Sequence, residues 1–300
     1  MTSPQSSAPD RLKTWHDGTE HLAINDTPTR RILTRLAVRL TTLLRPKSRN
    51  GACIFVSKNM VVKMGFRVHL QEAAAMRFVA EHAPGVPLPK VYCAFVHKHR
   101  AYIVMERVHG ESLAKARTRL AKDRRAADKI FGQLRRILDG LRALPPPPGA
   151  GVQSCNGGPL RDTRIPMAFP EFGPFRTVHD FHRWLREDFQ TSERPENFQG
   201  DEQDWLDLEE MTAMQDGPWP APVFTHGDLN QSNIIVRGDE VVAIIDWEFS
   251  GWYPVYWEYT SAWTTHILNT EWQGAIPRFL EPHPGALKME RTRQRWWGDI

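Results

Sequence analysis

The segment from residue 225 to residue 248, THGDLNQSNIIVRGDEVVAIIDWE, carries an acidic residue at each end of a predicted β-hairpin. His226 and Asp228 precede the hairpin, Asn233 follows Asp228 by five positions, and Asp246 ends an apolar strand. Phosphoryl transfer from ATP requires a carboxylate at the attacking hydroxyl and oxygen ligands for the Mg²⁺ that bridges the phosphates. An Asp, an Asn and a second Asp on the next strand supply this set, so the segment predicts phosphoryl-transfer chemistry.

The interval from Asp228 to Asn233 equals that of the protein-kinase catalytic loop, where an Asn follows the His-Arg-Asp triplet by five positions. The letters HGDLNQSNI, followed by AIIDWE, resemble the aminoglycoside phosphotransferase and choline kinase superfamily of small-molecule kinases, in which Gly replaces that Arg. With GGPLRD, FGPF, DFHRWL and GWYPVYWEY, the chain is similar to a fungal branch of that group over residues 50–265. The resemblance implies that Asp228 orients the acceptor hydroxyl and takes its proton, that Asn233 and Asp246 hold Mg²⁺, and that His226 supports the loop.

The resemblance also implies a nucleotide side of the site. A Lys on an early strand and a Glu on the next helix should pair to position the ATP phosphates, and MVVKMG and LQEAAAM supply Lys63 and Glu72. YIVMERVHG resembles the link between lobes, with Met105 against the adenine and the backbone of Glu106 and Val108 at its edge. A Gly-rich phosphate loop is missing before Lys63, where only the polar turn at residues 57–59 is present.

Three other interpretations compete with this one. Asp commonly forms turns and caps, so Asp228 and Asp246 could be purely structural. A catalytically silent kinase-fold protein that binds a nucleotide or a partner would suit the missing Gly-rich loop. A metal-dependent hydrolase could use His226, Asp228, Asp246 and Glu248, although it leaves Lys63 and Glu72 without a role.

The elements that must position these residues predict an α+β, two-lobed, protein-kinase-like fold. A hairpin over residues 52–64, a helix over 68–83 and a strand pair around the turn HKHR form a small antiparallel β lobe with one helix. Helices from residue 130 and from Thr177 begin a larger, mainly helical lobe. We expect a tail with a basic helix at 1–50, a nucleotide-binding lobe at 51–107 and a lobe with the catalytic loop, metal and acceptor sites at 108–300.

A basic amphipathic segment over residues 30–45 contains five Arg and no acidic residue. Its apolar residues recur at helical spacing on one side, namely Ile32, Leu33, Leu36, Leu40, Leu43 and Leu44. We expect this helix to dock on the body with its Arg side in solvent. Membrane-surface binding or a mitochondrial address is the alternative.

Composition limits the partners and the compartment. The formal net charge of +4 is too small to indicate nucleic-acid binding, and three cysteines without a CxxC pair indicate reduced thiols, so we expect a cytoplasmic protein. No apolar stretch approaches the length of a transmembrane segment. The oligomeric state is left open.

The expected acceptor is a small molecule with a hydroxyl group, and a cationic or amine-bearing alcohol is one class. Residues 187–210 hold ten Asp or Glu, which could attract a cation or simply form a solvated face. Aromatic residues crowd the chain after Asp246 and could line the acceptor cleft or the core: Trp247, Trp252, Tyr253, Tyr256, Trp257 and Trp263.

Overall fold

The computed structural model describes residues 16, 18–162, 164–165, 171–192, 194–265 and 269–298. The first fifteen residues of the predicted tail lie outside this set. The chain forms two compact units, one of Met1–Leu70 with Tyr92–Met105 and one of Gln71–Val91 with Glu106–Ile300. None of the helices in the described ranges combines the length and the apolar character that a membrane crossing requires.

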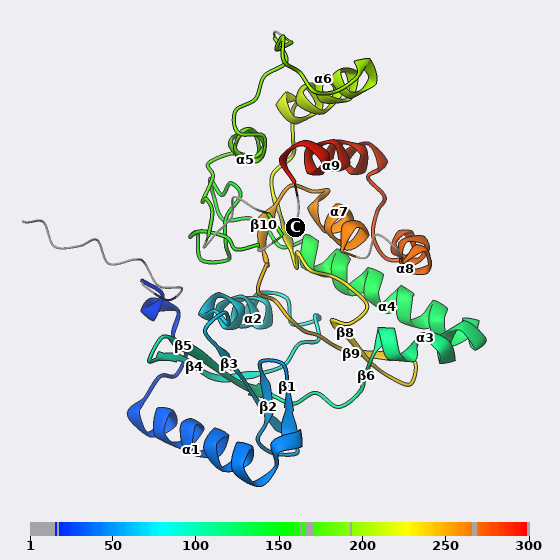
Figure 1. The fold of residues 1–300 in the computed structure, drawn as a ribbon. Helices are drawn as coiled ribbons and strands as arrows, with labels where there is room; N and C mark the ends of the chain where they lie inside the picture. The colour runs from blue at the N-terminus through cyan, green and yellow to red at the C-terminus, as the bar shows by residue number, and fades with distance from the viewer. Residues whose placement is uncertain are drawn as a thin grey trace, which may run out of the picture. The chain divides into compact units, whose positions relative to one another are not determined.

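The first unit is built on a five-stranded antiparallel sheet with the strand order β1-β2-β3-β5-β4 (Figure 1). Its core is a cluster of Val62, Cys93, Phe95, Tyr102 and Val104. The elements of this unit are η1 (Glu20–Leu22), α1 (Pro28–Leu44), η2 (Pro46–Ser48), β1 (Arg49–Asn50), β2 (Cys53–Phe55), β3 (Met60–Gly65), β4 (Val91–His97) and β5 (Arg100–Glu106).

The two strand pairs predicted in this unit are confirmed. β2 and β3 pair antiparallel with Ile54 opposite Val62, and the strands on either side of the HKHR turn are neighbours in the sheet. Lys98 and His99 both have positive φ, at 49° and 57°. Two successive positive φ angles match the twist of a tight hairpin, which explains why this short polar turn reverses the chain.

Helix α1 forms over the predicted basic segment, and the side opposite its leucines docks on the sheet. The hydroxyl of its N-cap Thr27 accepts the N–H of Arg30 at 3.3 Å. Thr34 and Thr41 are its buried residues, and Val38 between them packs on the core cluster. The helix docks with Arg35 and Arg39 in solvent, as expected, but the docked side carries small Thr and Val side chains while its leucines stay exposed.

The second unit contains a helical body and two small sheets (Figure 1). Helix α9 packs on α6 and α7, and β8 pairs with β9 as the hairpin predicted between the two acids. The elements are α2 (Leu70–His82), β6 (Glu111–Ser112), α3 (Leu113–Lys122), α4 (Arg124–Arg142), α5 (Val178–Leu185), α6 (Glu202–Asp216), β7 (Val223–Thr225), β8 (Ile234–Arg237), β9 (Glu240–Ile244), β10 (Gly251–Tyr253), α7 (Trp257–Thr264), α8 (Thr270–Ala275), η3 (Ile276–Arg278) and α9 (Pro284–Trp297).

The core of the second unit follows the predicted helical periodicity. Ile130, Leu134, Leu138 and Leu141 of α4 are all buried, at 1% exposure or less. Helix α5 starts at the predicted cap, where the Thr177 hydroxyl accepts the N–H of Asp180 at 3.0 Å. Helix α4 also packs on β7 and β9, so its apolar burial helps to hold the strands around the candidate site.

Candidate active site

Hydrogen bonds to Glu258 and through the His226 ring fix the backbone of the loop between β7 and β8. Glu258, fully buried on α7, accepts the N–H of His226 at 2.6 Å and the N–H of Gly227 at 3.2 Å. Nε2 of the buried His226 contacts the Ile245 carbonyl at 3.0 Å, while its Nδ1 accepts the N–H of Asp228 at 3.2 Å. This pattern requires a neutral ring, and burial, the main cause, lowers the pKa of His226 in the same direction.

Position 227 in the loop accepts only glycine. Its φ is +82°, and a Cβ placed on it would lie 2.6 Å from the carbonyl oxygen of Phe249. A left-handed φ disfavours any side chain, and backbone at that distance cannot rotate away. The replacement of the protein-kinase Arg by Gly in this triplet therefore has a steric reason.

The Asp228 carboxylate is partly buried and held by two neighbours. The side-chain amide of Asn233 donates to Oδ2 of Asp228 at 2.9 Å and to the backbone carbonyl of Asp228 at 2.9 Å. Burial, the largest contribution, and the nearby Asp246 raise the pKa of Asp228, and Arg164 opposes them. A carboxylate with a raised pKa and a fixed direction suits a general base.

Arg164 is a residue that the sequence did not reveal. Its guanidinium binds Asp162 in two places, at 2.8 and 2.5 Å, and donates to the Gly227 carbonyl at 2.5 Å. A terminal nitrogen lies 3.6 Å from the Asp228 carboxylate, and the guanidinium carbon lies 5.0 Å from the centre of the Phe249 ring. No local signal marks this residue, because it lies 64 positions before Asp228 in a Pro-rich loop.

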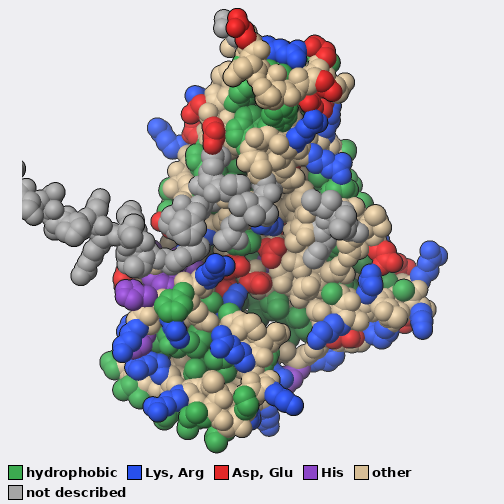
Figure 2. Space-filling view, viewed as in Figure 1, with side chains coloured by type: hydrophobic (Ala, Val, Ile, Leu, Met, Phe, Trp, Pro, Cys, Tyr) green, Lys and Arg blue, Asp and Glu red, His purple; other side chains and the backbone are tan. Residues whose placement is uncertain are grey.

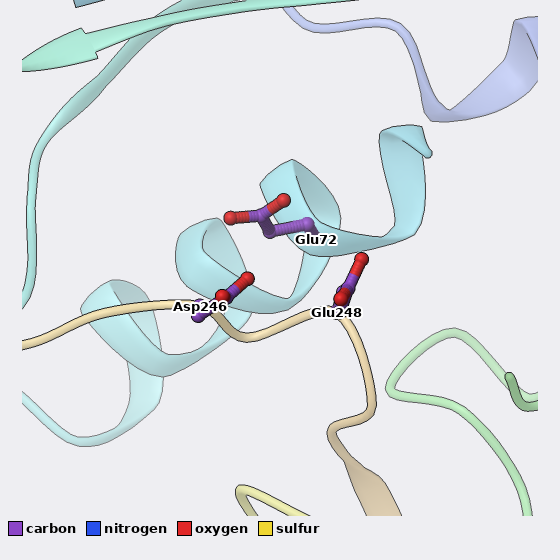
Figure 3. A group of neighbouring side chains, drawn as sticks. All are labelled: Glu72, Asp246 and Glu248. Carbon is purple, nitrogen blue, oxygen red and sulfur yellow. The ribbon is translucent and has the colours of Figure 1, made fainter. Parts of the chain in front are cut away.

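A cluster of three carboxylates forms the candidate metal centre. Glu72, Asp246 and Glu248 each bring an oxygen within 4.8 Å of the other two. Figure 3 shows the Glu72 side chain leaving α2 above the segment that carries the other two. Carboxylate oxygens are the ligands that Mg²⁺ prefers, and three negative charges at this spacing favour a divalent cation between them. The residues therefore fit the predicted metal.

The structure changes the emphasis within the predicted metal set. The nitrogen of the Asn233 amide is committed to Asp228, so only its Oδ1 could reach a cation. Its backbone carbonyl accepts the N–H of Ile245 at 2.9 Å, which ties it to the residue before Asp246. Asp246 has a φ of +69°, a left-handed conformation that Asp tolerates better than most residues. Glu248, named above only for the hydrolase alternative, joins the cluster.

The residues predicted for the nucleotide side fall in both units. Lys63 lies on β3 opposite Cys53, and Met105 is buried on β5. Glu106 belongs to the second unit, where its N–H donates to the Lys90 carbonyl at 2.9 Å. The ion pair of Lys63 with Glu72 and the adenine contacts of Met105, Glu106 and Val108 stay predictions.

The aromatic residues after Asp246 are mostly core. Trp247, Trp252, Tyr253 and Tyr256 have no exposed surface, and Trp257 is 3% exposed. Trp247 packs edge-on to the His226 ring, with 4.6 Å between centroids. Tyr253, Tyr256 and Trp257 belong to the core cluster of the second unit, so these buried rings leave little surface for an acceptor.

Acidic residues of the 187–210 segment are used within the protein. Asp201 and Asp204 form a capping box at the start of α6. Asp207 and Glu210 both contact Lys288 of α9, at 3.2 and 2.5 Å, and Asp204 binds Arg295 at 2.6 Å. These pairs favour a role in joining α6 to α9 over attraction of a cationic acceptor.

Comparison with known proteins identifies a family for this chain. Residues 67–289 match the sequence model of the phosphotransferase enzyme family, APH. This range covers more than half of the chain and includes the loop, Arg164 and the carboxylate cluster. Among curated protein sequences, no match was found.

Two solved structures illustrate the shared fold. The ternary complex of a thermostable mutant of aminoglycoside phosphotransferase APH(4)-Ia with AMP-PNP and hygromycin B superposes with a TM-score of 0.55 at 16% identity, covering 78% of this chain and 76% of the other. The apo form of a thermostable mutant of the same enzyme gives 0.51 at 15% identity, covering 81% and 80%. The predicted α+β fold is confirmed.

Proposed function

Because the chain belongs to the phosphotransferase enzyme family, we propose that this small-molecule kinase uses ATP and Mg²⁺ to phosphorylate a hydroxyl group. The solved relative that carries AMP-PNP and hygromycin B supports a nucleotide donor and a hydroxyl-bearing acceptor. Because that relative is an aminoglycoside phosphotransferase, an amine-bearing alcohol is the acceptor class to test first, although the acidic residues at 187–210 give it no support.

Asp228 is the residue on which this function depends. Its carboxylate is fixed by the Asn233 amide at 2.9 Å and by Arg164 at 3.6 Å, on a loop whose backbone N–H groups are anchored on the buried Glu258. Fixed orientation and a raised pKa are the two properties that a general base needs near neutral pH.

Asp228 takes up the proton that the reaction releases. Asp228 takes the proton of the acceptor hydroxyl as the acceptor oxygen forms its bond to the γ-phosphorus and the bond from that phosphorus to the β-γ bridging oxygen breaks. ADP leaves with the bridging oxygen. Asp246, Glu248 and Glu72, with Oδ1 of Asn233, would hold the metal ion, which supplies positive charge against the phosphate oxygens when bound.

Because the chain has three cysteines and no CxxC pair, we propose that the reaction takes place in the reducing cytoplasm.

Phosphate transfer from γ-labelled ATP into a panel of amino alcohols and a metabolite extract tests this function. We expect labelled product with the wild type and a loss of at least about a hundredfold in Asp228→Asn, the lower range of general-base catalysis. Asp239→Asn is the matched control, because Asp239 is an exposed carboxylate in the β8–β9 turn that pairs with Lys129. Equal transfer by the wild type and Asp228→Asn would remove Asp228 from the mechanism.

Thermal unfolding with and without Mg-ATP separates binding from turnover. Stabilisation is expected in the wild type and should weaken in Asp246→Asn, whose carboxylate belongs to the candidate metal centre. A wild type that shows no stabilisation at saturating nucleotide contradicts the proposal. Stabilisation without transfer to any acceptor would instead support the silent nucleotide-binding alternative.

A further inference from the structure

Helix α1 presents a continuous apolar face that the phosphotransferase site does not use. Its six large aliphatic residues are 46% to 77% exposed: Ile32, Leu33, Leu36, Leu40, Leu43 and Leu44. At 100° per residue they occupy an arc of about 120°, opposite the side that docks through Thr34 and Thr41. This is an unusual exposure of leucines for a helix that is already packed on a sheet.

The apolar face continues onto the sheet of the same unit. A hollow of about 400 Å³ is lined by Leu33, Leu36 and Leu40 of α1 together with Val56 and Met60. Met60 itself is 37% exposed. The apolar surface is therefore wider than the helix alone.

Positive charge accompanies this face. Residues 28–49 contain seven Arg or Lys and no Asp or Glu. Arg35 and Arg39 border the apolar arc and are exposed. In Figure 2, hydrophobic and basic side chains lie interleaved along the lower edge, where Figure 1 draws α1.

The helix is held in place rather than loosely attached. At its start Arg30 donates to the Tyr92 carbonyl at 3.2 Å, and Arg31 pairs with Asp26 at 2.5 Å. At its end Arg45 donates to the Val56 carbonyl at 2.8 Å. These bonds to neutral carbonyls keep the charges of Arg30 and Arg45, and they fix a helix about 25 Å long with its leucines facing outward.

We propose that α1 is a docking surface for an anionic lipid membrane, with the leucines inserted among the acyl chains and the Arg side chains at the lipid headgroups. A straight amphipathic helix with a basic border fits a membrane surface, which offers apolar depth and negative charge side by side. A second copy of the chain is the poorer occupant, because it would bring seven like charges against seven.

Co-sedimentation of the full chain with vesicles tests this surface, with phosphatidylcholine alone compared with phosphatidylcholine plus phosphatidylserine. Binding is expected with phosphatidylserine and should fall as salt rises. Leu36→Ser with Leu40→Ser should weaken it by about thirtyfold, because two inserted side chains are lost. Arg35→Gln with Arg39→Gln should weaken it by about twentyfold at low salt.

Matched controls isolate the position of these changes. Leu206→Ser removes a leucine that is 47% exposed on the acidic helix α6, and Arg124→Gln with Arg136→Gln removes two exposed charges from α4. Both should keep wild-type binding. All the substituted side chains are exposed, so near-wild-type thermal midpoints are expected and show that each variant is folded.

Several outcomes would overturn the proposal. A wild-type chain that stays in the supernatant with phosphatidylserine vesicles has no membrane surface. Equal binding by the wild type and the leucine variant, or to both vesicle types, removes the proposed chemistry. A leucine variant that changes only the sedimentation velocity would identify α1 as a contact between copies, and binding to soluble polyglutamate without vesicle binding would identify an acidic polypeptide partner.

Discussion

Replacement of Gly227 by Ala tests the steric account of the catalytic loop. The new Cβ would lie 2.6 Å from the Phe249 carbonyl oxygen, 3.1 Å from its carbon and 3.3 Å from the Phe249 Cβ. Two of these three atoms belong to the backbone, so relief of the clash requires the segment after Asp246 to move. The loop and the carboxylate cluster would then shift together.

The expected cost has two parts. A left-handed φ in a non-glycine residue costs about 1–2 kcal/mol, and overpacking costs about 1–3 kcal/mol more. The sum of about 2–5 kcal/mol corresponds to a fall in thermal midpoint of about 4–20 °C for a domain of 150 to 250 residues. Transfer activity should also fall, because the Gly227 carbonyl accepts from Arg164 and the next residue is Asp228.

Gly238→Ala is the control that isolates the clash. Gly238 lies in the β8–β9 turn with a φ of +61°, and a Cβ there meets no atom within 4 Å. It should cost only the left-handed conformation, about 1–2 kcal/mol, so its thermal midpoint should fall less than that of Gly227→Ala. Equal losses of midpoint in the two variants, measured by circular dichroism, would refute the steric reasoning.

Two further predictions concern charge. Arg164→Gln removes a cation 3.6 Å from the Asp228 carboxylate, so the pKa of Asp228 should rise further. The acid limb of the pH–kcat profile should then move to higher pH, with about tenfold lower activity at the acidic end of the profile. Arg164→Lys should shift the acid limb less, and identical profiles for the wild type and both variants would contradict the pairing. His182 is buried between the Gln215 carbonyl and the Tyr256 hydroxyl, and burial lowers its pKa to about 4. In the unfolded chain this histidine binds a proton at about pH 6.5, whereas in the folded chain it stays neutral down to about pH 4. The free energy of unfolding should therefore be highest above pH 6.5 and fall by about 3 kcal/mol as the pH drops toward 4. The urea midpoint should therefore depend less on pH between 7 and 4 in His182→Gln than in the wild type. The control His179→Gln replaces a half-exposed side chain and should keep the wild-type pH dependence. The same pH dependence in all three proteins would exclude His182 as the group that titrates.

Much of the catalytic loop could be predicted because its contacts are local. Asp228 bonds to Asn233 five positions later and to His226 two positions earlier, and the β8–β9 hairpin brings Asp246 back beside them. Hairpin pairing and turn preference act over a few residues, so the letters alone carry these distances. The core helices were predicted for the same reason, since their periodicity is a property of neighbouring turns.

Contacts between distant segments could not be predicted in this way. Arg164 reaches Asp228 from 64 positions earlier, and Glu258 anchors the loop from 32 positions beyond His226. Glu72 of α2 lies within 4.8 Å of Asp246 and Glu248, which follow it by more than 170 positions. Such contacts depend on how helices pack, which spacing along one segment does not encode.

The sequence by itself predicted the α+β fold, the hairpin between Asp228 and Asp246 and the strand pairs of the first unit, because these follow from residue type and short-range periodicity. Only the tertiary structure decided which distant residues meet: it places the Arg164 guanidinium beside Asp228 and groups Glu72 with Asp246 and Glu248. It also decided that the leucines of α1 are exposed. The periodicity of α1 shows that an apolar side exists, but only the packing shows that Thr34, Val38 and Thr41 form the docked side, because burial depends on the partner surface as well as on the helix.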